Sequence, residues 1–301
     1  GAASASCPGA AGDTTSLMIG DRNIRNMILA DGPAGLRLSR HFAADRDGNL
    51  IPGTEDASLG ELSLLAGDAG KKELPEGAVT YYQYCSAIPI ATLLAQTWDV
   101  DVIAQAGDIV GEEMEELGVT LWLAPGMNIH RNPLCGRNFE YYSEDPLAAG
   151  MCAAADTMGV QKHAGVGTTI KHFAFNNQED NRMHTNAHIG ERAIREIYLK
   201  CFEIAVKTAQ PMSIMTSYNL INGIHTANSY DLLTAVARDE WEFEGIVMTD
   251  WGTTGSIELN PGQKFKYGSS NAAGCIKAGN DLIMPGSQAD VDEIVRSVGA
   301  A

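Results

Sequence analysis

Long apolar segments and clustered positive charge are both missing from this sequence. No stretch of its 301 residues approaches the ~18 uninterrupted apolar residues that a membrane helix needs, so we expect no membrane contact. The 21 Lys and Arg residues stand against 38 Asp and Glu residues, which gives a net charge of −17. The basic residues form no cluster. Nucleic acid is therefore not an expected partner, because binding phosphates requires a basic patch.

Several motifs that mark other classes of protein are absent. The cysteines are scattered, and no two have metal-ligand spacing: Cys7, Cys85, Cys135, Cys152, Cys201 and Cys275. This usage fits a reducing, cytoplasmic setting. No Gly-rich dinucleotide or phosphate fingerprint follows a predicted strand, which argues against a Rossmann-type protein. A GxSxG elbow for a serine nucleophile is missing as well. We expect neither a metal nor a cofactor.

Short apolar runs alternate with amphipathic stretches along most of the chain. The apolar runs predict strands or strand ends at 26–32, 118–125, 166–173, 211–218, 245–251 and 281–286. The amphipathic stretches predict helices at 88–117, 143–164 (with Ser143 as N-cap), 190–209, 229–241, 269–278 and 288–298. This alternation predicts a parallel sheet. A doubly wound sheet and a (β/α)8 barrel both remain open at this point.

Residues 39–80 have a different character. They are polar and rich in Gly, Asp and Pro. The segment is predicted to be a long excursion loop between the first strand and the helix at 88–117.

Charged and aromatic residues gather where the predicted strands end. They are Asp31, Asn128, His130, Arg131, Arg137, Lys171, His172, Tyr218, Asp250 and Trp251. In a parallel α/β protein these ends converge on one face, which in a barrel carries the active site. The mixture suits a sugar, because charged groups bind hydroxyls and aromatic faces cover the C–H surface of the ring. Each residue alone also has a structural interpretation; Asp250, for example, could simply cap the next helix.

Schiff-base formation and zinc binding are two alternatives to sugar binding. Lys171, at the end of a predicted strand, could form a Schiff base as in a class I aldolase if its pKa were depressed. His184 and His188 have the i, i+4 spacing of a zinc pair on a helix. The intervening Thr and Asn and the glycine that follows make a helix improbable there, and no HExxH motif is present.

Six motifs, in this order, closely resemble the catalytic barrel of glycoside hydrolase family 3, the β-glucosidase type. They are DGPAGLR (31–37), GRNFEYYSEDP (136–146), KHFAFNNQEDNR (171–182), MTSYN (215–219), VMTDWG (247–252) and DLIMPG (281–286). The resemblance implies a (β/α)8 barrel, incomplete or irregular, that occupies residues 1–301 and includes the 39–80 insertion. It also implies that the family's second α/β sandwich domain lies outside this chain and is its partner.

The resemblance further implies a retaining, exo-acting β-glucosidase with Asp250 as nucleophile. Its pocket for the terminal sugar would comprise Asp31, Arg137, Lys171, His172, Arg182, Met215, Tyr218 and Trp251. Asp31 would accept hydrogen bonds from the 4- and 6-hydroxyl groups, which favours glucose over xylose. Lys171 and Arg182 are expected to favour the ionised form of Asp250. Oligomerisation and aglycone preference are left open.

The acid/base residue is not assigned within this chain. In the β-glucosidase branch it is a Glu on the sandwich domain. Glu140, Glu144 and Glu179 are the nearby carboxylates, and in the resembling motifs they look structural, paired with Arg or capping a helix. The alternative activities are a β-xylosidase and a glucosidase of plant glycosides such as saponins. An alternative of another class is a sugar-binding barrel without turnover.

Overall fold

The main sheet has six strands in the part of the chain that the structure describes. The computed structural model describes residues 7–14, 22, 25–55, 74–255 and 266–299. In spatial order the strands are β1 (Gly12–Asp13), β2 (Ile28–Ala30), β5 (Leu121–Trp122), β6 (Gly167–Phe173), β8 (Ser213–Thr216) and β11 (Ile246–Met248). Neighbours from β2 to β11 are parallel, and β1 is antiparallel to β2.

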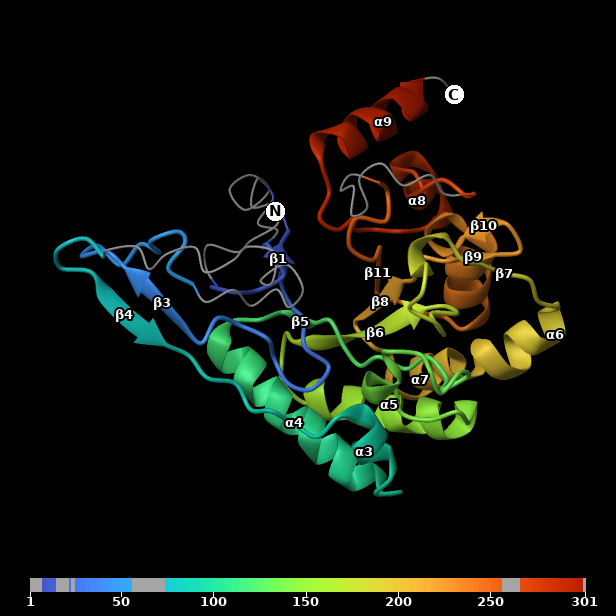
Figure 1. Cartoon of the computed structure of the whole chain (residues 1–301), viewed down its shortest axis with the longest axis horizontal. Coiled ribbons are helices and arrows are strands. Elements are labelled where there is room, and N and C mark those ends of the chain that lie inside the picture. The colour runs from blue at the N-terminus through green and yellow to red at the C-terminus, as the bar shows by residue number, and fades with distance from the viewer. Residues whose placement is uncertain (1–6, 15–21, 23–24, 56–73, 256–265, 300–301) are drawn as a thin grey trace.

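The order of the strands selects between the two architectures that the sequence left open. Spatial order follows chain order without reversal, whereas a doubly wound sheet reverses at its switch point. The sheet curls, and three helices lie along one side of it (Figure 1). They are α4 (Val100–Leu117), α5 (Pro146–Val160) and α7 (Lys200–Ala209). The fold is therefore a TIM-like barrel, which has fewer than eight strands in the described part of the chain.

Alternation along the strands separates an inner apolar layer from an outer one. The inner cluster takes one residue from each parallel strand except β6, and its other members lie next to the strands: Leu29, Leu121, Met215 and Met248, together with Ala11, Leu123 and Met284. Their sequence neighbours Ala30, Trp122, Ile214 and Val247 belong to the outer clusters instead. This period of two is the one expected for strands that are covered on both faces.

The caps explain where the outer helices begin. The predicted helix at 88–117 is divided into α3 (Ala91–Ala95) and α4, because the Asp99 carboxylate accepts hydrogen bonds from the Asp101 and Val102 N–H groups and starts a new helix. Likewise α5 is capped by Asp145 and not by Ser143, which was a wrong prediction. The Ser143 hydroxyl instead accepts from the backbone N–H of Asp145.

The remaining helices follow the prediction with shifted bounds, most of them shorter than predicted. The segment predicted as one helix at 190–209 comprises α6 (Glu191–Ala193), a π-helix, η3 (Ile194–Tyr198), and α7. Residues 229–241 contain another π-helix, η5 (Asp231–Glu240), and the last two helices are α8 (Ala272–Ala278) and α9 (Gln288–Gly299). Within the described residues, no helix is both long and apolar enough to cross a membrane.

Several short elements complete the fold. The 3-10 helices are η1 (Asn138–Glu140), η2 (Arg182–His184) and η4 (Thr226–Asn228). Three two-residue strands, β7 (Asn186–Ala187), β9 (Leu220–Ile221) and β10 (Ile224–His225), form a small separate sheet beside the main one.

The 39–80 segment is not simply a loop. Its two ends form an antiparallel hairpin, β3 (His41–Ala44) and β4 (Val79–Tyr82), which projects from one side of the molecule (Figure 1). Phe42 stacks on Tyr81 across the two strands, with ring centroids 5.6 Å apart. The aromatic and β-branched residues of VTYY favour such a pair of strands, and the polar composition of the segment hid this signal. Residues 56–73 lie outside the described part.

The predicted strand at 281–286 is also corrected. Leu282 makes only an isolated parallel bridge with Met248, so the sixth strand of the sheet is β1. Residues 282–285 instead face residues 11–14 across a cavity of about 170 Å³. We call this place, where the two edges of the curled sheet approach each other, the seam. Leu29 and Trp251 line it as well.

Candidate active site

Three contacts tie together the strand ends that carry the predicted site residues. Lys171 in β6 places its ammonium 2.9 Å from the carboxylate of Asp31, which follows β2. His172 Nε2 lies 3.8 Å from Asp250 Oδ2, beyond the end of β11. After β8, the hydroxyl of Tyr218 donates to the backbone carbonyl of Trp251 over 2.7 Å. The structure thus brings these residues to one end of the sheet, as the convergence of parallel strands predicts.

Asp31 is held as an anion at this end. It pairs with Lys171 and also with Arg37. Burial by itself raises the pKa of Asp31, but the two cations outweigh burial and leave the pKa well below its usual range.

Asp250 does not cap a helix. Turns follow it, and the next helix of the described part is α8, which is capped by the side chain of Asn271. The Asp250 carboxylate instead accepts a hydrogen bond of 2.7 Å from the backbone N–H of Trp251. Only 8% of Asp250 is exposed, so a carboxylate is held almost out of water at the end of a strand.

The electrostatic balance at Asp250 differs from the expectation. Arg182, Arg137 and Lys171 each favour its ionised form, as predicted for two of them. Burial is the largest influence, however, and the net result is that the pKa of Asp250 is raised above its ordinary value. The three cations limit this rise without cancelling it.

Both arginines are oriented by neighbouring carboxylates. Arg137, just before η1, pairs with the buried Glu140. Arg182, at the start of η2, donates to Glu179 over 2.8 Å, and its guanidinium lies 5.1 Å from the ring centroid of Tyr218. Glu140 and Glu179 are thus paired with arginines, as the sequence suggested, and each pairing keeps a cation near the site.

His172 is fixed through both its main chain and its ring. The side chain of Asn128 accepts from the His172 N–H and donates to the His172 carbonyl, each over 2.9 Å. The ring meets Tyr141 edge to face, and the Tyr141 hydroxyl lies 3.2 Å from Nδ1. Burial, together with the nearby Arg137, Lys171 and Arg182, lowers the pKa of His172 well below its ordinary value. The imidazole is therefore neutral.

Some predicted residues lie away from this cluster. Arg131 and Glu144 are exposed, and His130 Nε2 faces the backbone carbonyl of Tyr141 at 2.9 Å. Met215 lies in the inner apolar cluster with Leu123 and Met248, and Trp251 packs against the same cluster. Met215 therefore contributes apolar surface beneath the site.

Lys171 and the pair His184 and His188 do not have the surroundings that a Schiff base or a zinc site would need. The Lys171 nitrogen lies 2.9 Å from the Asp31 carboxylate and is engaged in an ion pair, whereas a Schiff base requires a lysine nitrogen that is free to attack. His184 faces the backbone carbonyl of Tyr267, and His188 contacts Asn186. Among the described residues, no three His, Cys, Asp or Glu side chains are grouped as metal ligands.

Sequence reasoning missed Tyr141 and Asn176. Both lie within motifs that carried the resemblance, but neither follows a strand end at a spacing that points to chemistry. Asn176 donates to the Tyr141 hydroxyl over 2.8 Å, which places both next to His172. Only the three-dimensional arrangement reveals this connection.

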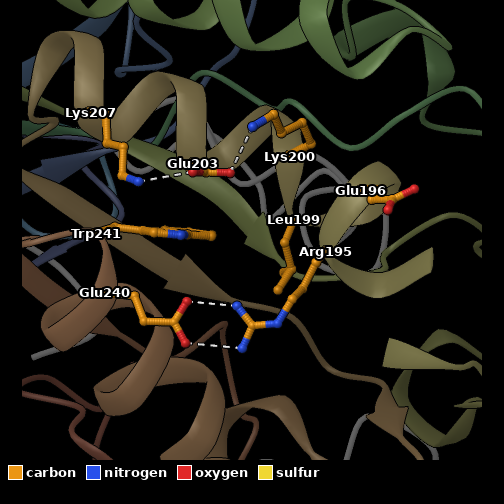
Figure 2. A pocket seen from close by; sticks show the side chains of 8 residues that line it. All are labelled: Arg195, Glu196, Leu199, Lys200, Glu203, Lys207, Glu240 and Trp241. Atoms are coloured by element: carbon orange, nitrogen blue, oxygen red, sulfur yellow. Dashed lines mark hydrogen bonds and ion pairs between the residues drawn. The ribbon is translucent and has the colours of Figure 1, made fainter. Parts of the chain in front are cut away.

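A larger cavity, of about 340 Å³, lies elsewhere on the molecule, and none of the predicted site residues lines it. Figure 2 shows its lining: the indole of Trp241 lies between two sets of ion pairs. We call it the Trp241 cavity; its other lining residues are Arg195, Glu196, Leu199, Lys200, Glu203, Lys207 and Glu240. Its charged side chains pair with one another, so the cavity is distinct from the converging strand ends in place and in chemistry.

Comparison with known protein families gives one match. Residues 71–300 match the family model described as the N-terminal domain of glycosyl hydrolase family 3. β-Glucosidase A of Butyrivibrio fibrisolvens is 49% identical over 205 residues, which are 67% of this chain and 24% of that protein. An exo-α-(1→6)-L-arabinopyranosidase of Bifidobacterium breve is 40% identical over 277 residues, 92% of this chain and 30% of that protein.

Solved structures agree with this match. The structure of β-glucosidase 3B from Thermotoga neapolitana in complex with glycerol has a TM-score of 0.76 and 40% identity, and it covers 98% of this chain and 35% of its own. The same enzyme in complex with α-D-glucose gives a TM-score of 0.74 and 41% identity, with 98% of this chain and 34% of its own covered. The chain thus spans about a quarter to a third of the proteins it resembles.

Proposed function

The chain belongs to glycosyl hydrolase family 3, and on this premise we propose that residues 1–301 form the catalytic barrel of a retaining, exo-acting β-glucosidase. The reaction is hydrolysis of terminal non-reducing β-D-glucosyl residues through a covalent glycosyl-aspartate. Relatives named β-glucosidase support the class of reaction. The observation that carries the proposal is the buried Asp250 carboxylate, which lies among three cations and beside an indole.

Asp250 is the nucleophile in this proposal. A carboxylate oxygen attacks the anomeric carbon, the bond to the leaving oxygen breaks, and that oxygen takes a proton from a general acid. Water, deprotonated by the same group, then displaces Asp250 and restores the carboxylate. Because only ionised Asp250 attacks, the rate of the first step rises as the pH increases through its raised pKa.

The second carboxyl group comes from outside this cluster. Retaining hydrolysis needs it about 5–5.5 Å from the nucleophile. Glu140 and Glu179 are each bound to an arginine, and Glu144 is exposed, so none of the three is free to give up a proton beside Asp250. We infer that a glutamate of a second α/β sandwich domain supplies this group, as the family resemblance implies.

The terminal sugar binds between the ends of β2, β6 and β8. The anionic Asp31 accepts from the 4- and 6-hydroxyl groups, and Lys171 and His172 donate to neighbouring oxygens. Arg137, Arg182, Met215 and Tyr218 complete the pocket, and Trp251 covers the side toward the leaving group. An acceptor for a 6-hydroxyl group selects glucose over a pentose, because a pentose lacks the hydroxyl group that would donate to it.

One relative favours a second candidate. The arabinopyranosidase of Bifidobacterium breve matches 92% of this chain, more than β-glucosidase A does. The nitrophenyl α-L-arabinopyranoside and nitrophenyl β-glucoside, compared at equal concentration, separate the two activities. Faster release of nitrophenol from the glucoside is expected, and the reverse would favour the second candidate.

Covalent labelling tests the proposal directly. The chain is incubated with 2,4-dinitrophenyl 2-deoxy-2-fluoro-β-glucoside, and its intact mass and peptide map are measured. The fluorine slows both steps, while dinitrophenolate leaves without a proton, so labelling does not require the acid. We expect one fluoroglucosyl group on Asp250, and free glucose in excess should protect against it.

The outcomes separate the alternatives. An adduct on another carboxylate would overturn the assignment of Asp250. Saturable binding of glucose without any adduct would favour a sugar-binding barrel that lacks turnover. We also expect this chain to hydrolyse dinitrophenyl β-glucoside far faster than methyl β-glucoside, because only the latter needs an acid; equal rates would mean that an acid lies within the 301 residues.

A further inference from the structure

The two ring nitrogens of His172 face different partners. Nε2 lies 3.8 Å from Asp250 Oδ2, and Nδ1 lies 3.2 Å from the hydroxyl of Tyr141. A neutral imidazole carries one N–H, and the nitrogen that holds it is set by the hydrogen bond that the other one makes. The tautomer of His172 therefore decides whether a donor or an acceptor faces Asp250.

A chain of hydrogen bonds leads from a charged residue to Tyr141. Arg182 donates to Oε2 of Glu179 over 2.8 Å, and Oε1 of Glu179 accepts from the side chain of Asn176 over 3.1 Å. An ionised carboxylate only accepts, so the Asn176 atom that faces it is the amide nitrogen. The same nitrogen lies 2.8 Å from the Tyr141 hydroxyl oxygen and donates to it. Glu179 thus fixes the orientation of the Asn176 amide group, and with it the direction of the hydrogen bond from Asn176 to Tyr141.

Because Asn176 donates to the Tyr141 hydroxyl, the position of the Tyr141 proton is determined as well. Tyr141 is fully buried, and within the described part of the chain its hydroxyl has two partners, Asn176 and His172. Because Asn176 donates, the hydroxyl hydrogen can only be accepted by Nδ1 of His172. If Nδ1 carried a proton, a buried hydroxyl hydrogen would have no acceptor, which is costly.

We propose that Tyr141 and Asn176 are positioning residues that hold His172 as the neutral tautomer with its proton on Nε2. Double protonation of the ring is opposed first by burial and then by the surrounding Arg137, Lys171 and Arg182. Asn128 fixes the main chain on both sides of the same residue, so the direction of the N–H is fixed together with its presence.

The consequence for catalysis rests on the function proposed above. The ring presents a fixed N–H donor on the side of Asp250, and a hydroxyl oxygen of the bound sugar accepts from it. The other tautomer would present a lone pair next to a carboxylate and would need the sugar hydroxyl to donate instead. A donor that is oriented before binding loses little entropy when the sugar arrives.

Nitrogen NMR tests the tautomer without any turnover. The full chain is labelled with 15N-histidine, and long-range 1H–15N correlations distinguish Nε2–H from Nδ1–H. The His172 signals are identified by their loss in His172→Gln. We expect the Nε2–H pattern in the unmodified chain between pH 5 and 8. The Nδ1–H pattern, or the pattern of the doubly protonated ring, would overturn the proposal whether or not Asp250 becomes labelled.

Tyr141→Phe and a matched control test the role of the hydroxyl. Tyr141→Phe removes the donor to Nδ1, and we expect the pure Nε2–H pattern to be lost and fluoroglucosyl labelling to slow about tenfold. Tyr198→Phe removes a hydroxyl from a ring that stacks on Phe175, and it should change neither. An unchanged tautomer in a folded Tyr141→Phe variant would refute the role of Tyr141. If that variant fails to fold, the tautomer of the unmodified chain still decides the proposal.

Discussion

The site around Asp250 and the Trp241 cavity are both rich in charge, but their charges are balanced differently. In the cavity, Arg195 makes two bonds to Glu240, of 2.6 and 3.0 Å. Glu203 there pairs with two lysines. These groups are about a quarter to one half exposed, and each carboxylate has a cation of its own.

At the site around Asp250, every neighbouring cation already forms an ion pair with another carboxylate. Lys171 and Arg37 both pair with Asp31, and Arg137 and Arg182 each pair with a glutamate, so all four cations are in ion pairs before Asp250 is counted. Asp250 is a fourth, buried carboxylate, and the only basic side chain within 4 Å of it among the described residues is His172, which is neutral. A charge buried without its own partner costs folding free energy. The comparison therefore separates charges that are balanced by partners from one buried charge that lacks a partner of its own, as expected for the nucleophile proposed above.

The largest expected effect is on catalysis. Asp250→Asn should lower the hydrolysis of dinitrophenyl β-glucoside by about 10⁴-fold, since it removes the proposed nucleophile while keeping the shape of the side chain. The same variant should be at least as resistant to heat as the unmodified chain, because a desolvated charge is gone. Glu240→Gln in the Trp241 cavity should change the rate less than twofold. Rate measurements with thermal unfolding of both variants check this, and a loss of thermal stability in Asp250→Asn would contradict the cost inferred above.

A second prediction concerns a buried carboxyl group with no cation. Asp156 in α5 is 2% exposed and accepts a hydrogen bond of 2.6 Å from Tyr142, and burial raises its pKa to about 7. Because this value lies above that of the unfolded chain, its favourable contribution is complete below pH ~4 and is lost as the pH rises through about 7. Asp156→Asn should remove this dependence and stabilise the protein by about 4 kcal/mol at pH 8.

Urea unfolding from pH 4 to 9 measures this effect. Glu116→Gln, an exposed substitution on the neighbouring α4, is the control and should leave the pH profile unchanged. Parallel profiles for Asp156→Asn and the unmodified chain would mean that Asp156 is ionised in the folded protein. The raised pKa of Asp156 could then no longer serve as a model for the pKa that Asp250 would have without its neighbouring cations.

The smallest effect compares two lysines. Lys171→Met leaves the Asp31 carboxylate paired with Arg37 alone. It should lower the free energy of unfolding by about 3 kcal/mol. Lys207→Met breaks an exposed pair with Glu203 and should cost less than about 0.5 kcal/mol. Urea unfolding at one pH measures both. Equal losses of unfolding free energy in the two variants would mean that the ion pairs of the two regions contribute equally to stability.

The sequence predicted the strands well because their apolar runs carry the signal locally. The ends of β2, β6, β8 and β11 were all found, and the residues that follow them do converge. The barrel could not be separated from a doubly wound sheet by pattern alone, because both repeat strand and helix; only the spatial order of strands decides.

The errors have local physical causes. The hairpin of β3 and β4 was hidden because its strands are only four residues long and border a polar segment. The run at 281–286 looked like a strand, but its hydrogen bonds with β11 do not extend beyond its start. Tyr141 and Asn176 could not be found, since their importance depends on where the Tyr141 proton goes.

The seam between residues 11–14 and 282–285 makes one part of the barrel softer than the rest. A fully closed barrel has a hydrogen-bonded ladder all the way round. In the described part of this chain the ladder stops at β1 and β11, and the two edges face each other across a cavity. No backbone hydrogen bond joins residues 11–14 to residues 282–285 within the described part, so opening there needs less free energy than opening between paired strands. Trp251 lines the seam and directly follows Asp250, so an opening of the seam would displace the indole next to the proposed nucleophile.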